Sequence, residues 1–152
     1  MKHLLCLCSL VMIIFSSGCG NNAETPAVQE ILIVNFRDGD QGVITKNSYS
    51  GSIAIRVEGV GQASSSEWSD AFYIYTDSKG NEIQPWHPTE FYNWTLWING
   101  EPVDSLVSSI PAYNTDHVYE FTINASGGRL TFAVGDTGTS DNSGSYTVSI
   151  LK

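Results

Sequence analysis

Short segments with the spacing of β-strands recur along this chain of 152 residues, and they constrain its fold more than any other feature. In IAIRVEGV (53–60), Ile53, Ile55 and Val57 fall on one face of a strand, whereas Ala54 and Arg56 fall on the other. Such alternation is typical of a half-buried strand. It recurs in YEFTIN (119–124), LTFAVG (130–135) and YTVSIL (146–151), and further candidate strands are ILIVNF (31–36), AFYIYT (71–76) and TLWING (95–100).

The segments between these strands carry turn signals, and no part of the sequence has a sustained helical stripe of apolar residues. Turn-forming runs such as SKGN (78–81) and NGEP (99–102) follow two of the candidate strands. The pattern predicts an all-β fold, an antiparallel β-sandwich of jelly-roll or Greek-key type with about seven or eight strands. We assign this domain to residues 28–152, a length that allows one sizeable core.

The N-terminal residues have the layout of an export signal. Lys2 and His3 precede the apolar run LLCLCSLVMIIF, which is too short to span a bilayer because spanning requires about 20 residues. The residues Ser17 and Gly18 before Cys19 resemble the lipobox of bacterial lipoproteins, although Ser16 stands where that motif usually has leucine. The alternative is a plain secretory signal that is cut nearby.

This resemblance implies that residues 1–18 are a lipoprotein signal peptide and that Cys19 carries the lipid. Residues 19–27, largely polar, are then a flexible tether. Lipid chains attach a protein to a membrane without spanning it, so we expect membrane contact through this anchor only. Gly20 rather than Asp follows Cys19, which favours the outer membrane or cell surface of the envelope.

Cysteine positions and charge narrow the possible partners. Cys6, Cys8 and Cys19 all lie at or before the proposed processing site, so the exported domain must fold without disulfides. The formal net charge is -9, and loss of Lys2 with the signal changes it to 6 minus 16, or -10. An acidic surface without a Lys/Arg cluster argues against a nucleic-acid partner and suits cations or uncharged ligands.

The loop before the last predicted strand contains Asp136, Asp141 and Asn142 among Gly and Thr residues. These residue types are ordinary turn formers and would close a hairpin without any ligand. However, two carboxylates in a short loop repel each other unless a cation or protons compensate. Calcium takes carboxylate, amide and backbone carbonyl oxygens, so the loop is also a candidate Ca²⁺ site. The composition alone leaves both interpretations open.

The run from Gly135 to Ile150 resembles the C-terminal part of the PA-I-type galactophilic bacterial lectins, which are calcium-dependent jelly-roll proteins. The similarity comprises Asp136, the NSGS run at 142–145, and the alternating Tyr146, Val148 and Ile150. Upstream, GVGQAS (59–64) resembles a loop of that family that contributes a backbone carbonyl to the ion. The resemblance implies a metal site formed by Asp136, Asp141 and Asn142 and by the carbonyls of Ser65 and Gly138. Here Asp141 replaces an asparagine, and the loop is slightly shorter than in the family.

In that family a His-Pro-x-x-Gln loop holds the sugar, and His87-Pro88-Thr89-Glu90 has the same spacing. The resemblance therefore implies that His87 and Glu90 contact a carbohydrate. Aromatic faces also suit the apolar faces of sugars, and all four tryptophans lie close together in the sequence. We take Trp86 and Tyr92 as candidate ligand-binding residues, and Trp97 as a core residue.

These observations predict a surface-anchored, calcium-dependent, lectin-like module that binds carbohydrate, with galactosides as the implied sugars. The alternative is a structural or protein-interaction β-sandwich of the cell envelope in which calcium only stabilises a loop. We expect no enzymatic activity, because the sequence contains no nucleophile elbow, paired-histidine zinc motif or phosphate loop. The oligomeric state is not predicted.

Overall fold

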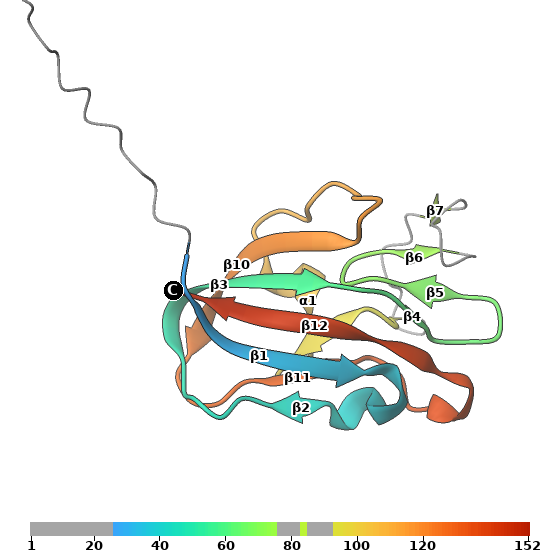
Figure 1. Ribbon diagram of the computed structural model, residues 1–152, viewed down its shortest axis with the longest axis horizontal. Coiled ribbons are helices and arrows are strands. Elements are labelled where there is room, and N and C mark those ends of the chain that lie inside the picture. The colour runs from blue at the N-terminus through green and yellow to red at the C-terminus, as the bar shows by residue number, and fades with distance from the viewer. Residues whose placement is uncertain (1–25, 76–82, 85–92) are drawn as a thin grey trace, which may run out of the picture.

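A computed structural model describes residues 26–75, 83–84 and 93–152, and these residues form an antiparallel β-sandwich (Figure 1). Strands dominate and the helices are short, so the predicted all-β sandwich is confirmed. None of the helices in the described part of the chain is both long and apolar enough to cross a membrane.

Four long strands form the centre of the larger sheet. Strand β12 pairs with β1 on one side and with β3 on the other, and β3 pairs in turn with β10. Short strands extend this sheet from the start of β12, in the order β4, β5, β6 and β7. The bounds are β1 (Val28–Asn35), β3 (Ser50–Glu58), β4 (Gly61–Gln62), β5 (Trp68–Ser69), β6 (Ile74–Tyr75), β7 (Ile83–Gln84), β10 (Val118–Ser126) and β12 (Ser143–Leu151).

A smaller sheet packs against the larger one, with strand order β2-β11-β8-β9. Its strands are β2 (Val43–Ile44), β8 (Leu96–Ile98), β9 (Glu101–Pro102) and β11 (Thr131–Val134). The helical elements are the short α1 (Val103–Leu106) and two 3-10 helices, η1 (Phe36–Gln41) and η2 (Thr139–Asp141).

Alternation along the strands places the apolar side chains between the sheets. Ile53, Ile55 and Val57 of β3 are buried as expected, together with Tyr146, Val148 and Ile150 of β12. Burial of a Val, Leu, Ile or Phe side chain stabilises the fold by about 1.5–3 kcal/mol, so this layer supplies much of the driving force. The aromatic rings of Phe36 and Tyr146 pack edge to face within it, 4.8 Å apart.

The expectation that Trp97 lies in the core is wrong. Its neighbours Leu96 and Ile98 are buried, whereas Trp97 is half-buried on the opposite face of β8. There its indole lies against Gly135, where any side chain would collide with the ring, and its Nε1 donates to the Asn93 carbonyl at 3.1 Å. Leu96 and Ile98 therefore form the face of β8 that points into the core, and Trp97 lies on the other face.

The described residues contain more strands than the seven or eight predicted, because several strands of two residues were not recognisable from the sequence. Every predicted segment nevertheless contains a strand. The segment 71–76 is the poorest match, since only Ile74 and Tyr75 pair and residue 76 lies outside the described residues.

Candidate functional site

The loop at 135–142 lies at the end of the sandwich opposite to the first residues of β1. Because β1 and β12 are antiparallel, Val28 pairs near Leu151 whereas Asn35 pairs with Ser145. Helix η1 follows β1 and η2 precedes β12, so the two 3-10 helices meet at this end (Figure 1). The backbone N–H of Asp40 in η1 donates to the Asp136 carbonyl at 3.1 Å, which joins the two loops.

Asn142 is the central side chain of this contact, and it is only 1% exposed. Its Nδ2 donates to the Phe36 carbonyl at 3.0 Å and to Asp136 Oδ2 at 2.9 Å. The Nε of Arg37 donates to the Asn142 carbonyl at 3.0 Å. In contrast, Asn142 Oδ1 is buried without a hydrogen-bond partner. A buried acceptor of this kind is costly unless a donor or a cation reaches it.

Asp136 is half-buried, and each of its carboxylate oxygens accepts one hydrogen bond. Oδ1 accepts from the backbone N–H of Gly138 at 2.9 Å, and Oδ2 accepts from Asn142. The first bond closes a local turn, as expected for an aspartate in a hairpin. An ionised carboxylate has about four acceptor positions, so these two bonds leave capacity for a further ligand.

The other predicted metal ligands lie at the same end of the molecule but are exposed. Asp141 ends η2, Gly138 precedes η2, and Ser65 lies in the loop after β4. The pairing of Ser143 with Gln62 brings that loop alongside the start of β12, and the Ser65 carbonyl accepts from Gln62 Nε2 at 3.2 Å. Within residues 26–75, 83–84 and 93–152, no three His, Cys, Asp or Glu side chains form a metal-binding group. An ion here would therefore depend on amide and backbone oxygens in addition to the carboxylates of Asp136 and Asp141.

A hollow of about 430 Å³ lies between η1 and the start of β12. Asn35, Arg37, Asp38, Ser143 and Gly144 line it, and Asn35 Nδ2 donates to Asp38 Oδ2 at 3.0 Å. The lining thus offers guanidinium, amide, hydroxyl and carboxylate groups. Sequence reasoning missed this hollow, because it requires the antiparallel pairing of residues that are far apart in the chain.

The predicted sugar-contacting residues His87, Glu90, Trp86 and Tyr92 lie outside the described residues, as does the predicted lipidation site Cys19. Whether the first four approach the loop at 135–142 stays a prediction.

A second polar cluster, which sequence reasoning missed, surrounds Asp70. This carboxylate is fully buried and accepts hydrogen bonds at Oδ1 from the backbone N–H groups of Phe72 and Tyr73. At Oδ2 it accepts from the Tyr119 hydroxyl at 2.7 Å, and His117 Nδ1 lies 2.9 Å away. Burial, followed by the charge of Asp70, raises the pKa of Tyr119 well above its ordinary range.

His117 joins this cluster in an unusual backbone conformation, with φ of 53°, and its ring stacks on Tyr75 at 5.2 Å. Tyr146, from β12, donates to the Asp70 carbonyl at 2.9 Å. Burial also raises the pKa of Tyr146. The cluster therefore ties the β5–β6 turn to β10 and β12. Neither Asp70 nor His117 stands in a motif, and only the fold brings them together.

Comparison with protein-family models, with curated proteins and with solved structures found no significant match. The resemblance to PA-I-type lectins therefore rests on the quoted residues alone.

Proposed function

We propose that this chain is a surface-anchored, calcium-dependent carbohydrate-binding module. The observation that carries the proposal is Asn142 Oδ1, a buried oxygen without a hydrogen-bond partner. The other atom of the same amide, Nδ2, donates to Asp136 Oδ2 at 2.9 Å. A cation with oxygen ligands would satisfy that atom and would counter the charge of Asp136 and Asp141.

The available donors suit calcium better than a transition metal. Asp136, Asp141 and Asn142 offer carboxylate and amide oxygens, and the Gly138 and Ser65 carbonyls belong to exposed residues at the same end of the sandwich. Calcium takes about six to eight oxygen ligands, more than these residues supply as single donors. The remaining positions are then open to water or to the hydroxyl groups of a sugar. When bound, the ion would supply positive charge that holds and orients such hydroxyls.

The hollow between η1 and the start of β12 supports a carbohydrate ligand. Sugar hydroxyls both donate and accept hydrogen bonds, and the hollow offers Arg37 and Ser143 as donors and Asp38 as an acceptor. Galactosides or related sugars are the ligands that the resemblance implies, with His87, Glu90, Trp86 and Tyr92 as further contacts. We propose binding rather than catalysis.

Export and anchoring complete the proposal. Residues 1–18 would direct secretion, Cys19 would carry the lipid, and residues 19–27 would link it to the sandwich. The module would then be held at the outer membrane or cell surface.

A purely structural role of the same loop is the second candidate. The contacts of Asn142 with Phe36, Arg37 and Asp136 already tie η1 to η2, which favours a loop whose task is to hold the sandwich together. In that case calcium would stabilise the contact and no sugar would bind.

Retention of the soluble domain (residues 27–152) on an immobilised galactoside column separates the two candidates. The lectin proposal predicts retention with millimolar calcium and release by a chelator. Asn142→Ala should abolish retention, whereas Asp116→Asn, at an exposed carboxylate of another loop, should keep it. Absence of retention on galactosides and on a wider glycan array, by protein that is folded and calcium-loaded, would contradict the lectin proposal and leave the structural role.

A further inference from the structure

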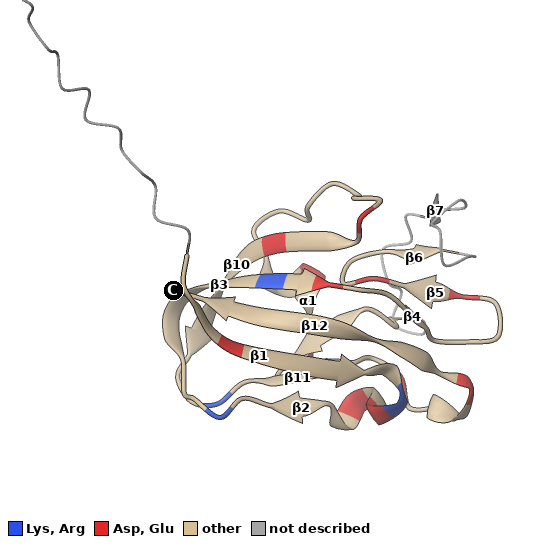
Figure 2. Ribbon diagram, viewed as in Figure 1, with Lys and Arg blue, Asp and Glu red and all other residues tan. Residues whose placement is uncertain are grey.

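Charge is distributed unevenly between the two ends of the sandwich. Lys46, Arg129 and Lys152 are exposed at the end where the chain enters β1, since the Lys152 N–H donates to the Ala27 carbonyl at 2.9 Å and Arg129 Nε donates to the Thr45 carbonyl. We call these three residues, with the neighbouring Val28 and Ile44, the basic end. Figure 2 shows the basic corner between β2 and β3 at this end and acidic segments around η1, η2 and the loop after β4.

Glu30 is an acidic side chain at this end, and its carboxylate is engaged within the fold. Glu30 accepts hydrogen bonds from the backbone N–H groups of Lys46 and Asn47, at 2.6 and 3.2 Å, and from the Tyr49 hydroxyl at 3.0 Å. The three cationic side chains, in contrast, are exposed. Glu30 stays ionised at neutral pH because these hydrogen bonds lower its pKa, so it offsets one of the three cations. The three cations and Glu30 together still give the basic end a positive charge on a protein whose overall charge is -9.

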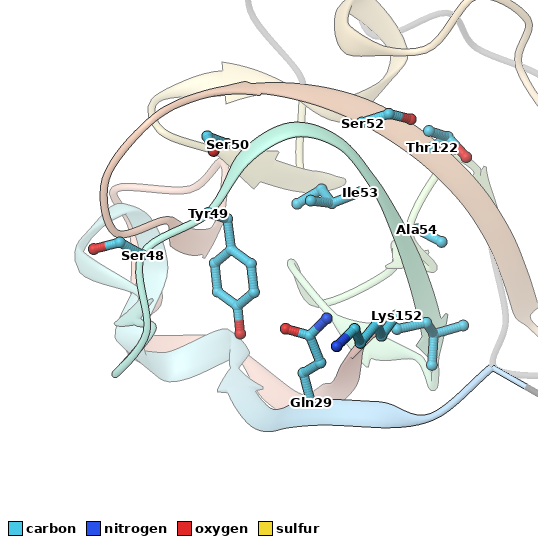
Figure 3. Close-up of a pocket in the computed structure, with 10 residues that line it drawn as sticks. Gln29, Ser48, Tyr49, Ser50, Ser52, Ile53, Ala54, Thr122 and Lys152 are labelled. Carbon is cyan, nitrogen blue, oxygen red and sulfur yellow. The ribbon is translucent and has the colours of Figure 1, made fainter.

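The same end carries exposed apolar side chains and a polar hollow. Val28 is 54% exposed and Ile44 is 50% exposed. A hollow of about 500 Å³ includes Lys152 in its lining, and Figure 3 shows Tyr49, Gln29 and Lys152 converging on it, with Ser48 and Ser50 at its rim. The Tyr49 hydroxyl already donates to Glu30, so the donors left in the hollow are the Lys152 ammonium, the Gln29 amide and the serine hydroxyls. Such donors suit the oxygens of a phosphate group.

We propose that the basic end docks on a lipid surface that contains anionic phosphate headgroups. The proposal rests on the proposed lipid anchor at Cys19, because the tether of residues 19–27 would then join the sandwich at this end and hold it nearest to the bilayer. Attraction to anionic lipid and burial of apolar side chains add in such surface contacts. The three cations match the lipid charge, Val28 and Ile44 contact the interfacial region, and the hollow receives a headgroup.

Docking in this orientation places the candidate calcium loop away from the membrane. Strand β1 runs from Val28 at the basic end to Asn35 beside the loop, and its 8 residues span about 26 Å at a rise of about 3.3 Å each. The domain therefore stands upright on the surface, with the loop at 135–142 directed outward.

Hydrogen exchange of the full chain, extracted from bacterial membranes and reconstituted into vesicles, tests the proposal. One set of vesicles contains phosphatidylcholine alone and the other also contains about 30% phosphatidylglycerol. We expect slower exchange at residues 43–49 and 126–130 in the anionic vesicles only, and loss of this protection at about 0.5 M salt, which screens the attraction. Equal exchange in both vesicles, or selective protection of residues 63–67 and 135–142, would overturn the proposal.

Paired variants make the test specific. The double change Lys46→Gln and Lys152→Gln should weaken docking by about 25-fold, since each cation near an anionic surface contributes about fivefold. The control Ser108→Glu and Ser109→Glu lowers the net charge equally at exposed positions outside the basic end and should keep the protection. If the control loses protection as fully as the lysine variant, net charge and not the basic end is responsible, and the proposal fails.

Flotation of the protein with lipid vesicles in a density gradient tests the proposed lipid anchor separately. Flotation of the chain with both kinds of vesicle supports the anchor, and flotation with anionic vesicles alone supports docking while contradicting the anchor. Neither result depends on calcium or sugar, so a failure of the docking proposal is distinguishable from a failure of the lectin proposal.

Discussion

Glu30 and Asp136 are carboxylates at opposite ends of the sandwich, and their hydrogen bonds give them different roles. Burial alone would raise the pKa of Glu30, but hydrogen bonds from the backbone of Lys46 and Asn47 and from Tyr49 outweigh it and lower that pKa below its ordinary range. These bonds fix the loop between β2 and β3. Asp136 accepts fewer bonds and belongs to the candidate ion site.

Glu30 should make stability depend on pH. Because its pKa is lower in the folded than in the unfolded state, its contribution is complete above the unfolded pKa of about 4.3 and is lost as the pH falls through the folded pKa. We expect Glu30→Gln to lower the free energy of unfolding at pH 7, and the difference from wild type to shrink below about pH 4. Urea unfolding at several pH values measures this difference.

The matched control for Glu30 is Glu101→Gln, at an exposed carboxylate of β9. This variant should follow the wild type across the pH range. A Glu30→Gln difference that stays constant down to about pH 2 would show that the ionised form of Glu30 is not what stabilises the loop.

Individual site residues were predictable from the sequence only where they are close together in the chain. Asp136 and Asn142 stand six residues apart, and the structure joins them by a hydrogen bond. The contact of Asn142 with Phe36 spans 106 residues and the pairing of Asp70 with His117 spans 47, so no local pattern reports either one.

At the scale of elements, alternation predicted the long strands because each has one buried face. β3 and β12 lie where the alternating residues indicated. Strands of two residues, such as β4 and β5, contain too few positions for any alternation to be visible. The 3-10 helix η1 was also unpredictable, since its FRDGDQ sequence resembles an ordinary turn.

The Asp70 cluster stabilises the join between the β5–β6 turn, β10 and β12, and it provides a prediction at this scale. In Asp70→Asn the carboxylate charge is lost and an amide NH2 replaces one acceptor. The NH2 either opposes the two backbone N–H groups or requires the Tyr119 hydroxyl to accept instead of donate. Leaving a buried donor or acceptor without a partner costs about 1–3 kcal/mol, and we expect a loss of stability of this order. Chemical denaturation followed by tryptophan fluorescence measures it.

Asp116→Asn is the control, because Asp116 is an exposed carboxylate next to His117 in the chain. It should change stability by less than about 0.5 kcal/mol. Equal stability of Asp70→Asn and the wild type would mean that the cluster does not hold these elements together.

At the scale of the whole molecule, the antiparallel arrangement of β1 and β12 separates the two proposed functional surfaces. One end carries the attachment to the proposed tether and the exposed Lys46, Arg129 and Lys152, and the other carries Arg37 and the loops around Asn142. Composition indicated only the overall acidity. The separation of charge between the ends depends on which loops the fold brings together, so it became visible only in three dimensions (Figure 2).

The central claim is that the loop at 135–142 binds calcium through Asn142 and Asp136. Equilibrium dialysis of chelator-treated protein against radioactive calcium tests it most directly, with Asn142→Ala, Asp136→Ala and the control Asp116→Asn in parallel. We predict saturable uptake of about one ion per chain by the wild type and the control, and loss of uptake in the other two variants. Absence of calcium uptake by folded wild-type protein, or unchanged uptake in both Asn142→Ala and Asp136→Ala, would contradict the claim.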